Sequence, residues 1–387
     1  MERYFGFDLG DAESAVTYLK KDGQPEPEVV PVREAGSFIT AYARLRTGDL
    51  LIGEEACYTP DAAERHLRFK SRFLTEPASA RDIQSFAGGV LGELYMAGNL
   101  VKGEDCCFYI GCPAGWDRLQ RERYREIFEA AGYPPVRIIS ESRAALVSAC
   151  QSRHFQVGYD ILSRPVLVVD MGSSTTDFAY INSGREVELQ TAGEVRLGGG
   201  IMDELLLDAA VEASRDREAI RKVFAESPPW RSYCEFAARR LKEKYFSDEA
   251  YWKGKDCLQT VMIPVAESAR TGRKPGFFRR PSFLRLQMCM NEKMAARLLE
   301  APAPQLEGRS FRQVFEASLR EIRAKLADPS SGSGQSPSGG SHLPELLFLT
   351  GGVSRMPALR DWCREAFPEA VVITGAEPEY SVSRGLA

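Results

Sequence analysis

The sequence has few histidines, no cysteine pairs at metal-binding spacing and no basic block. Its three histidines, His66, His154 and His342, are scattered, so a histidine metal site has little support. The nine cysteines are an odd number without paired spacing, which favours reduced core cysteines over a disulfide framework. The formal net charge of −4 and the mixed charge pattern leave no footprint for nucleic acid.

Long apolar runs are also missing. No run approaches the roughly 20 residues that a membrane-spanning helix needs. The first residues lack the basic and apolar regions of a signal peptide. We therefore expect a cytoplasmic protein with neither membrane nor nucleic acid as a partner. The 387 residues suffice for two lobes with sizeable cores.

What the sequence does contain is a strand, a polar turn and a returning strand over residues 165–181. Four large apolar residues lead into Asp170, a hydroxyl-rich turn follows at 172–175, and Asp177 opens the second run. The amides and hydroxyls of such a turn suit phosphate oxygens, and the flanking carboxylates suit hydrated Mg²⁺.

Residues 3–19 repeat this pattern. Asp8 aligns with Asp170 and Gly10 with Gly172, at a constant offset. One such hairpin is weak evidence, because any edge hairpin can carry it. Two in register favour a duplicated, phosphate-clamping architecture over coincidental hairpins.

The remaining chain alternates between strand and helix patterns, which predicts the α/β class. Asp117 is expected to cap a helix that ends at Gly132, and a short strand leads to Glu141. Further helices are predicted near 81–98, 201–215, 232–246, 291–300 and 311–327, and further strands near 106–111, 136–140, 258–265, 283–289 and 346–349.

Six segments, in order, resemble landmarks of the nucleotide-binding domain of DnaK-type (70-kDa) heat-shock chaperones, within the actin and sugar-kinase superfamily. They are the phosphate motifs at 8–10 and 170–177, the hinge at 111–114, the glutamate-bearing segment at 138–145, the turn at 197–199 and the adenosine motif at 351–357. The resemblance implies a two-lobed, actin-like ATPase fold with duplicated mixed sheets around a nucleotide cleft.

The resemblance also implies a division of the chain. Residues 1–163 would form lobe I, and 164–375 lobe II with a helical insertion at about 204–327. A Ser/Gly/Pro-rich loop at 329–342 is expected to be flexible, and 376–387 would start a helix that returns to lobe I. Because that helix is cut short, we expect the natural protein to extend beyond Ala387.

The implied ligands are ATP or ADP and Mg²⁺. Asp8 and Asp170 would hold Mg²⁺ through water, unless they only cap their turns. Glu141 would lie near the attacking water, unless it is simply a charge favoured by the helix dipole. Thr175 and Asp177 would bind the γ-phosphate or orient water, unless they only form the turn.

A catalytic lysine is implied after the early strands, where it would neutralise developing phosphoryl charge. Lys70 fits this role, with Arg68 and Arg72 as competitors. The other implied nucleotide contacts are Gly10, Gly172, Ser173, Ser174, Gly198, Gly199, Lys242, Gly351, Gly352 and Arg355. A solvated helix charge explains Lys242 nearly as well, and ordinary turns explain the glycines. Pro113 is either a switch or a plain strand end.

Some positions depart from the family pattern. The first phosphate turn has Asp11 and Ala12 where two threonines are usual, and Arg239 and Val353 replace a glutamate and a serine of the adenosine site. Asp11 puts a carboxylate near the expected phosphates. These changes bear on the hydrolysis rate and the tightness of binding rather than on the fold.

Three functions stay open from the sequence. The leading hypothesis is a slow Mg-ATPase with lobe closure as output. The second is a nucleotide-binding sensor or scaffold with little hydrolysis, and the third is an actin-like filament protein; a sugar kinase ranks last. The resemblance implies a peptide-binding domain beyond this chain, a cochaperone or an exchange factor as partners.

Overall fold

The computed structural model describes residues 3–20, 26–59, 62–151, 161, 163–190, 197–265, 282–328, 343–375 and 377–387. It divides into two compact units, Met1–Arg196 with Phe315–Ala387 (unit 1) and Leu197–Val314 (unit 2). The predicted α/β class is confirmed. The units do not follow the expected boundary at 163/164, so the division into lobes stays a prediction, and the loop at 329–342 lies outside the described residues.

Unit 1 contains two large mixed sheets. The first has the order β3-β2-β1-β8-β9, with β4 also paired to β2. The strands β1, β2 and β3 run antiparallel, whereas β8 and β9 continue parallel to β1. The strands are β1 (Arg3–Leu9), β2 (Glu13–Lys20), β3 (Glu28–Val30), β4 (Ser37–Ile39), β8 (Cys106–Cys112) and β9 (Val136–Ser140).

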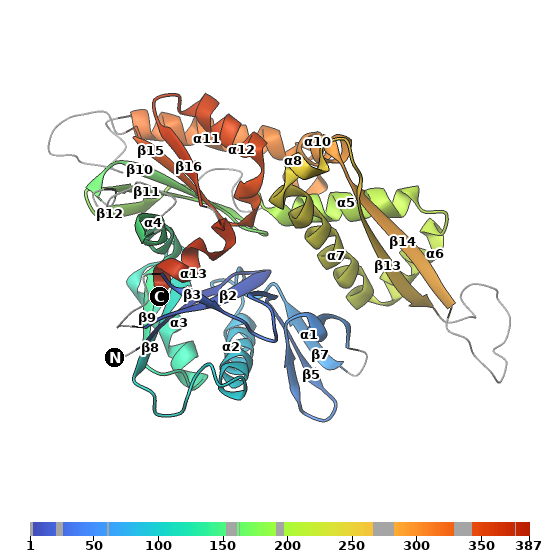
Figure 1. Cartoon of the computed structure of the whole chain (residues 1–387), viewed down its shortest axis with the longest axis horizontal. Coiled ribbons are helices and arrows are strands. Elements are labelled where there is room, and N and C mark those ends of the chain that lie inside the picture. Colours follow the sequence, from blue (N-terminus) through green and yellow to red (C-terminus); the bar gives the residue numbers. More distant parts are fainter. Residues whose placement is uncertain are drawn as a thin grey trace. The chain divides into compact units, whose positions relative to one another are not determined.

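The second sheet repeats this topology. Its order is β12-β11-β10-β15-β16, again with an antiparallel meander on one side and two parallel strands on the other. The strands are β10 (Val166–Met171), β11 (Thr176–Asn182), β12 (Arg185–Glu188), β15 (Leu346–Thr350) and β16 (Val371–Thr374). The internal repeat predicted from the two hairpins is therefore a duplication of a whole sheet (Figure 1).

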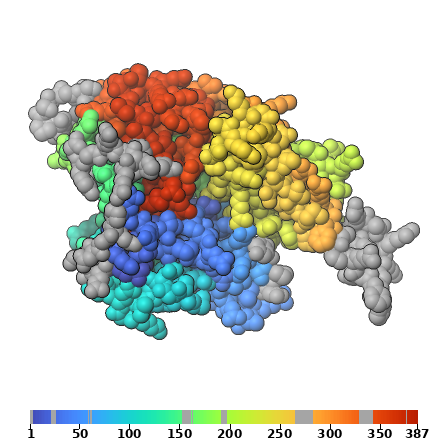
Figure 2. Space-filling model, viewed as in Figure 1, coloured from blue at the N-terminus to red at the C-terminus, as the bar shows by residue number. Residues whose placement is uncertain are grey.

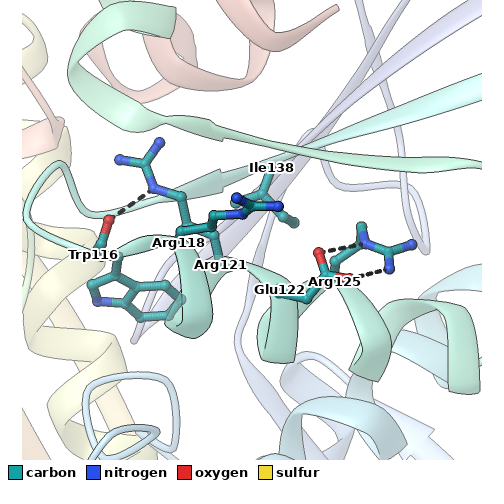
Figure 3. A pocket seen from close by; sticks show the side chains of 6 residues that line it. All are labelled: Trp116, Arg118, Arg121, Glu122, Arg125 and Ile138. Atoms are coloured by element: carbon teal, nitrogen blue, oxygen red, sulfur yellow. Dashed lines mark hydrogen bonds and ion pairs between the residues drawn. The ribbon is translucent and has the colours of Figure 1, made fainter.

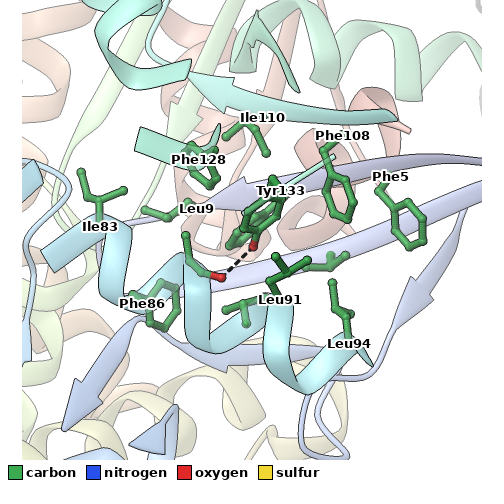
Figure 4. Close-up of a cluster of buried hydrophobic side chains, with 14 of the residues drawn as sticks. Phe5, Leu9, Ile83, Phe86, Leu91, Leu94, Phe108, Ile110, Phe128 and Tyr133 are labelled. Carbon is green, nitrogen blue, oxygen red and sulfur yellow. Dashed lines mark hydrogen bonds between the residues drawn. The ribbon is translucent and has the colours of Figure 1, made fainter. Parts of the chain in front are cut away.

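Helices α2 (Ala78–Met96) and α3 (Arg118–Ala130) cover one face of the first sheet and bury an aromatic-rich core (Figure 4). The rings of Phe5 and Phe108 stack with centroids 4.6 Å apart, and the hydroxyl of Tyr133 donates to the carbonyl of Ala87 at 2.9 Å. As predicted, Asp117 caps α3, here in a reciprocal box with Gln120. This packing holds β8 in place, whose last residues belong to the segment 111–114 that the resemblance assigns to a hinge.

A small sheet of β6 (Leu50–Ile52), β5 (Ala41–Leu45) and β7 (Ala62–Leu67), with α1 (Glu54–Tyr58), extends the N-terminal half. On the second sheet, Phe315 of α11 (Phe311–Ala327) places its ring 6.4 Å from Phe178 and 6.1 Å from Trp362 of α12 (Pro357–Ala366). The described helices of unit 1 thus pack on the sheets through apolar faces.

Helix α13 (Ser381–Leu386) packs against the first sheet and against α4 (Glu141–Gln151). The hydroxyl of Thr17 in β2 donates to the carbonyl of Ser383 at 2.6 Å. Two glycines permit the approach: a Cβ at Gly6 would lie 2.1 Å from the Ser383 carbonyl oxygen, and one at Gly385 only 1.6 Å from that of Ala144. The C-terminal and N-terminal segments therefore lie together on the face shown in Figure 2.

Unit 2 is a helical layer with one long hairpin. Helices α5 (Gly199–Ala213), α6 (Arg217–Glu226) and α7 (Pro228–Ser247) pack with the antiparallel pair β13 (Cys257–Val265) and β14 (Ser282–Met290). The short α8 (Glu249–Trp252) and α10 (Glu292–Glu300) complete it, the latter capped by Asn291. Among the described parts of both units, no helix has the length and apolar character to cross a membrane.

The close contact at Gly385 yields a stability prediction. Gly385→Ala should lower the free energy of unfolding by about 1–3 kcal/mol, because the new methyl group meets backbone that cannot rotate away. Gly88→Ala in α2 is the matched control, since a Cβ there meets nothing within 4 Å and alanine favours a helix. Urea unfolding measures both; an equal stability of Gly385→Ala and the unmodified protein would contradict this packing.

Candidate functional site

Two hairpin turns, β1–β2 and β10–β11, form the centre of the candidate site. In the second turn, the amide of Gly172 donates to the carbonyl of Thr175 at 2.9 Å, and the Thr175 hydroxyl donates to Asp177 at 3.0 Å. In the first, a Cβ at Gly10 would lie 2.3 Å from the Glu13 carbonyl oxygen, so only glycine fits this turn. Both turns therefore have the tight geometry that the sequence predicts.

Asp11 joins the two turns. Its Oδ2 accepts a hydrogen bond from the Ser174 hydroxyl at 2.7 Å, and its Oδ1 accepts one from the Ser71 amide at 3.0 Å. Three segments far apart in the sequence thus meet at one carboxylate. The structure brings the tips of the predicted hairpins together, as a phosphate clamp requires.

Lys70 and Glu141 form a close pair beside these turns. The Lys70 Nζ lies 2.5 Å from Glu141 Oε1, and the two side chains are only 10% and 13% exposed. Glu141 is the first residue of α4, directly after β9, and Gly111 of β8 makes room for it: a Cβ there would lie 3.0 Å from the Glu141 Cγ. The alignment of β8 with β9 therefore fixes where this carboxylate points.

The geometry separates Lys70 from its two competitors. Arg72 donates to the carbonyls of Leu67 and Arg68 and pairs with Glu76, all within its own segment. Arg68 is exposed and has a left-handed backbone, with φ of 52°. Lys70 is the one of the three that pairs with Glu141, although its catalytic role stays a prediction.

The electrostatics of the site are dominated by carboxylates. Burial, followed by repulsion from Glu141, raises the pKa of Asp8 to about 7 and that of Asp177 to about 6. The same causes raise the pKa of Asp170 well above its ordinary value, with Asp177 and Asp8 adding repulsion. Burial disfavours the charged form of Lys70, but attraction to Glu141, Tyr124 and Asp8, together with the hydrogen bond to Glu141, outweighs it and raises the pKa of the ammonium. Four acidic side chains therefore share one ammonium.

This arrangement fits a hydrated cation. The excess negative charge is costly in a partly buried place, and a divalent ion would relieve it. Within the described ranges, no three His, Cys, Asp or Glu side chains converge as direct metal ligands. Water and phosphate oxygens would therefore have to supply most of the ligands, as Mg²⁺ commonly accepts.

The predicted adenosine turn at 351–352 follows β15 and contacts the second hairpin. Gly351 has φ of 78°, and a Cβ there would lie 2.3 Å from the Met171 carbonyl oxygen and 2.8 Å from Asp170 Oδ1. Gly352 opens a short 3₁₀ turn with free space where a Cβ would stand. Arg355 makes a forked pair with Glu379, at 2.6 and 3.1 Å, which holds its guanidinium plane in place.

Gly198, Gly199 and Lys242 belong to unit 2. Gly198 is the N-cap of α5 and Gly199 its first residue. Lys242 is not the solvated helix charge that the sequence also allowed. Its side chain is 5% exposed, with Nζ 2.5 Å from Asp203 Oδ1 and 2.8 Å from the Gly199 carbonyl oxygen. The lysine therefore stabilises the predicted glycine turn through the Gly199 carbonyl. Its contact with a nucleotide stays a prediction.

Sequence reasoning missed Glu186 on β12. This carboxylate is 7% exposed and accepts hydrogen bonds from the hydroxyls of Ser140 and Ser142 and from Arg143 Nε at 3.0 Å. The two serines flank Glu141, so Glu186 holds the start of α4 in place. Strand alternation could have assigned Glu186 to one face of β12. No sequence pattern indicated that its partners would be Ser140 and Ser142, more than 40 residues earlier.

A surface pocket of about 380 Å³ lies along α3 (Figure 3). In it, Arg121 donates to the Trp116 carbonyl at 2.9 Å and Arg125 pairs with Glu122. The other lining residues are Arg118 and Ile138. None of the six is a predicted site residue.

The duplicated mixed sheets are consistent with the two-lobed, actin-like ATPase fold that the resemblance implies. The family model described as "Hsp70 protein" matches residues 96–244. The chain is 25% identical over 410 residues to the chaperone protein DnaK of Thermotoga petrophila, covering 98% of this chain and 56% of that protein. It is 23% identical to the DnaK of Thermosipho melanesiensis, covering 99% of this chain and 60% of the relative.

A third relative, the DnaK of Cenarchaeum symbiosum, is 28% identical over 238 residues, which cover 57% of this chain and 34% of that protein. The chain spans a little over half the length of the relatives that it matches from end to end. The predicted resemblance to the nucleotide-binding domain of DnaK-type Hsp70 chaperones is confirmed.

The raised carboxyl pKa values predict how stability depends on pH. The pKa of Asp8 is raised to about 7 in the folded protein, mainly by burial, whereas the unfolded chain ionises this carboxyl near its ordinary pKa of 3.8. The folded state therefore binds more protons between these values, and the free energy of unfolding should fall as pH rises through this window. Without Mg²⁺ or nucleotide, we expect the melting temperature to drop from pH 6 to pH 8.

Asp8→Asn should reduce this drop by at least about 2 °C, because the amide cannot ionise. Asp49→Asn is the control, since it removes an exposed carboxylate of the β5–β6 turn. Thermal scans at both pH values measure the effect. An unchanged pH dependence in Asp8→Asn would show that this buried carboxyl does not titrate as inferred.

Proposed function

We propose that this chain binds Mg-ATP and hydrolyses it slowly, as a DnaK-like nucleotide-binding domain whose two predicted lobes close as its output. The observation that carries the proposal is the meeting of the two hairpin tips beside the Lys70–Glu141 pair. The similarity to DnaK chaperones supports a nucleotide as the ligand.

Mg²⁺ bound with the nucleotide would neutralise phosphate charge. In the proposal, Asp8 and Asp170 orient water molecules around this ion from opposite hairpins. Their raised pKa values support it, because a nearby divalent cation would offset the burial and the repulsion that disfavour their ionised forms. Gly10, Gly172, Ser173 and Ser174 would supply the turn groups that face the phosphates.

Hydrolysis needs a group that orients water and a cation that stabilises developing charge. We assign the first role to Glu141 and the second to Lys70. Their 2.5 Å contact holds the two side chains together, and Glu186 binds the serines on either side of Glu141. Thr175 and Asp177, already hydrogen-bonded to each other, would assist in placing water or the γ-phosphate.

The nucleoside would be held by the remaining predicted residues. Gly351 and Gly352 leave room for close approach of the base and ribose, and Arg355 offers a guanidinium plane fixed by Glu379. The nucleotide contacts that the sequence resemblance assigns to Gly198, Gly199 and Lys242 stay predictions. A peptide-binding domain outside these residues, a cochaperone and an exchange factor are proposed partners, with the cytoplasm as location.

A second candidate is a nucleotide sensor with little or no hydrolysis. The observation that favours it is the engagement of Asp11 with Ser71 and Ser174, donors that the first function would use for phosphate. Tight nucleotide binding without turnover by the pure protein would decide for this candidate.

The role of magnesium predicts that phosphate release from ATP requires the ion. Chelation with EDTA should abolish it, and Asp170→Ala should lower it at least tenfold, because half of the proposed cation support is gone. Asp361→Asn on α12 provides an exposed control that changes the same charge. Release that persists in Asp170→Ala at the original rate would contradict the proposed cation site.

Glu141→Gln separates binding from chemistry. The amide keeps the size of the side chain but orients water poorly, so single-turnover hydrolysis should slow by about 100-fold or more. Binding should change little, since Glu141 contacts Lys70 rather than the turns. Rapid-quench assays and calorimetry measure the two quantities, with Glu129→Gln on α3 as the control. Equal hydrolysis rates in Glu141→Gln and the unmodified protein would remove Glu141 from the mechanism.

A further inference from the structure

Asp11 occupies a place that its charge makes unusual. It is half-buried at the tip of the β1–β2 turn, the same hairpin that carries Asp8. The second hairpin brings Asp170 and Asp177 to the same region, where carboxylates already repel one another. A further carboxylate is held there by hydrogen bonds from two other segments, the Ser174 hydroxyl and the Ser71 amide.

These two donors are of the kind that bind phosphate oxygens. A hydroxyl and a backbone amide that converge from different segments resemble part of an anion site. The amide is that of Ser71, the residue directly after Lys70, whose ammonium pairs with Glu141. The Asp11 carboxylate thus already accepts the hydrogen bonds from Ser174 and Ser71 that a bound anion would otherwise accept.

We propose that Asp11 is an internal competitor for the terminal phosphate of the nucleotide, so that this chain favours nucleoside diphosphates over triphosphates. The inference rests on the proposed function and specifies its ligand. A terminal phosphate gains the Ser71 and Ser174 donors only by displacing Asp11, and it then stands close to a displaced negative charge. A diphosphate does not need these donors and leaves the contact intact.

The contact also bears on the two hairpins. Ser174 lies in the β10–β11 turn and Asp11 in the β1–β2 turn, so the same carboxylate links the two sheets directly. Triphosphate binding must break this link, whereas diphosphate binding preserves it. Asp11 is therefore a specificity-determining residue, placed outside the set that the proposed function uses for binding.

The experiment compares Mg-ADP with a non-hydrolysable Mg-ATP analogue by calorimetry. Asp11→Ser removes the charge and the reach to both donors, and Asp11→Asn keeps the size but removes the charge. Glu76→Gln is the matched control, an exposed carboxylate paired with Arg72 in the segment after Lys70. Circular dichroism confirms that each variant is folded.

We expect the unmodified chain and Glu76→Gln to bind the diphosphate more tightly. In Asp11→Ser the ratio of the two dissociation constants should shift toward the triphosphate by roughly tenfold or more, the effect of about one hydrogen bond to a charged group. Asp11→Asn should shift it in the same direction. A variant that binds the triphosphate where the unmodified chain does not would support the proposal equally.

Two results would overturn the proposal, and they are distinguishable. If all forms bind both nucleotides and the ratio in Asp11→Ser equals that in Glu76→Gln, Asp11 does not discriminate, although the proposed function stands. If no form binds either nucleotide, the proposed function fails and this inference fails with it.

Discussion

The candidate site depends on a local excess of negative charge. Asp8, Asp170, Asp177 and Glu141 lie near Lys70 in a partly buried place, and burial, followed by repulsion from Glu141, raises the pKa values of the three aspartates. Replacing some of these carboxylates with neutral side chains would raise the free energy of unfolding. Their concentration at the tips of two hairpins is understandable if a cation, arriving with an anionic ligand, completes the balance of charge.

The duplicated sheets explain how this concentration is built. In each sheet, the next-to-last residue of a buried central strand is an aspartate, and the antiparallel return keeps the following turn short. Contacts between the two sheets then position the shared groups: Asp11 reaches Ser174, and Glu186 reaches the serines beside Glu141. Helix α13 contacts Gly6 of β1 and Ala144 of α4, so it connects the first sheet with the helix that begins at Glu141. Any relative motion of the two sheets would therefore act directly on the candidate catalytic groups.

Local patterns were enough to predict much of this fold. The two hairpins, the capped helix after Asp117 and the strand before Glu141 follow from alternation and capping, which are properties of short segments. The pairing of β1 with β8 and of β10 with β15 closes the sheets over long stretches of chain, and the repeat was the only hint of it.

The long-range contacts could not be predicted in the same way. Sequence alone left Lys70, Arg68 and Arg72 as rivals, because their difference arises from which one faces α4. The burial of Lys242 against Asp203 rules out the alternative of a solvated charge, which the sequence had left open because both residues lie on helices whose facing sides depend on tertiary packing. Asp11 stood out in the sequence as a departure, but its two donors come from segments about 60 and 163 residues away.

The central claim is that the two acid-tipped hairpins hold a divalent cation together with a nucleotide. Electron paramagnetic resonance of Mn²⁺, used in place of Mg²⁺, tests it most directly. With ADP present, the unmodified chain should sequester one Mn²⁺ per molecule, and the double variant Asp8→Asn/Asp170→Asn should leave the ion bound to free nucleotide. Equal Mn²⁺ sequestration by both forms, or none by the unmodified chain, would contradict the account.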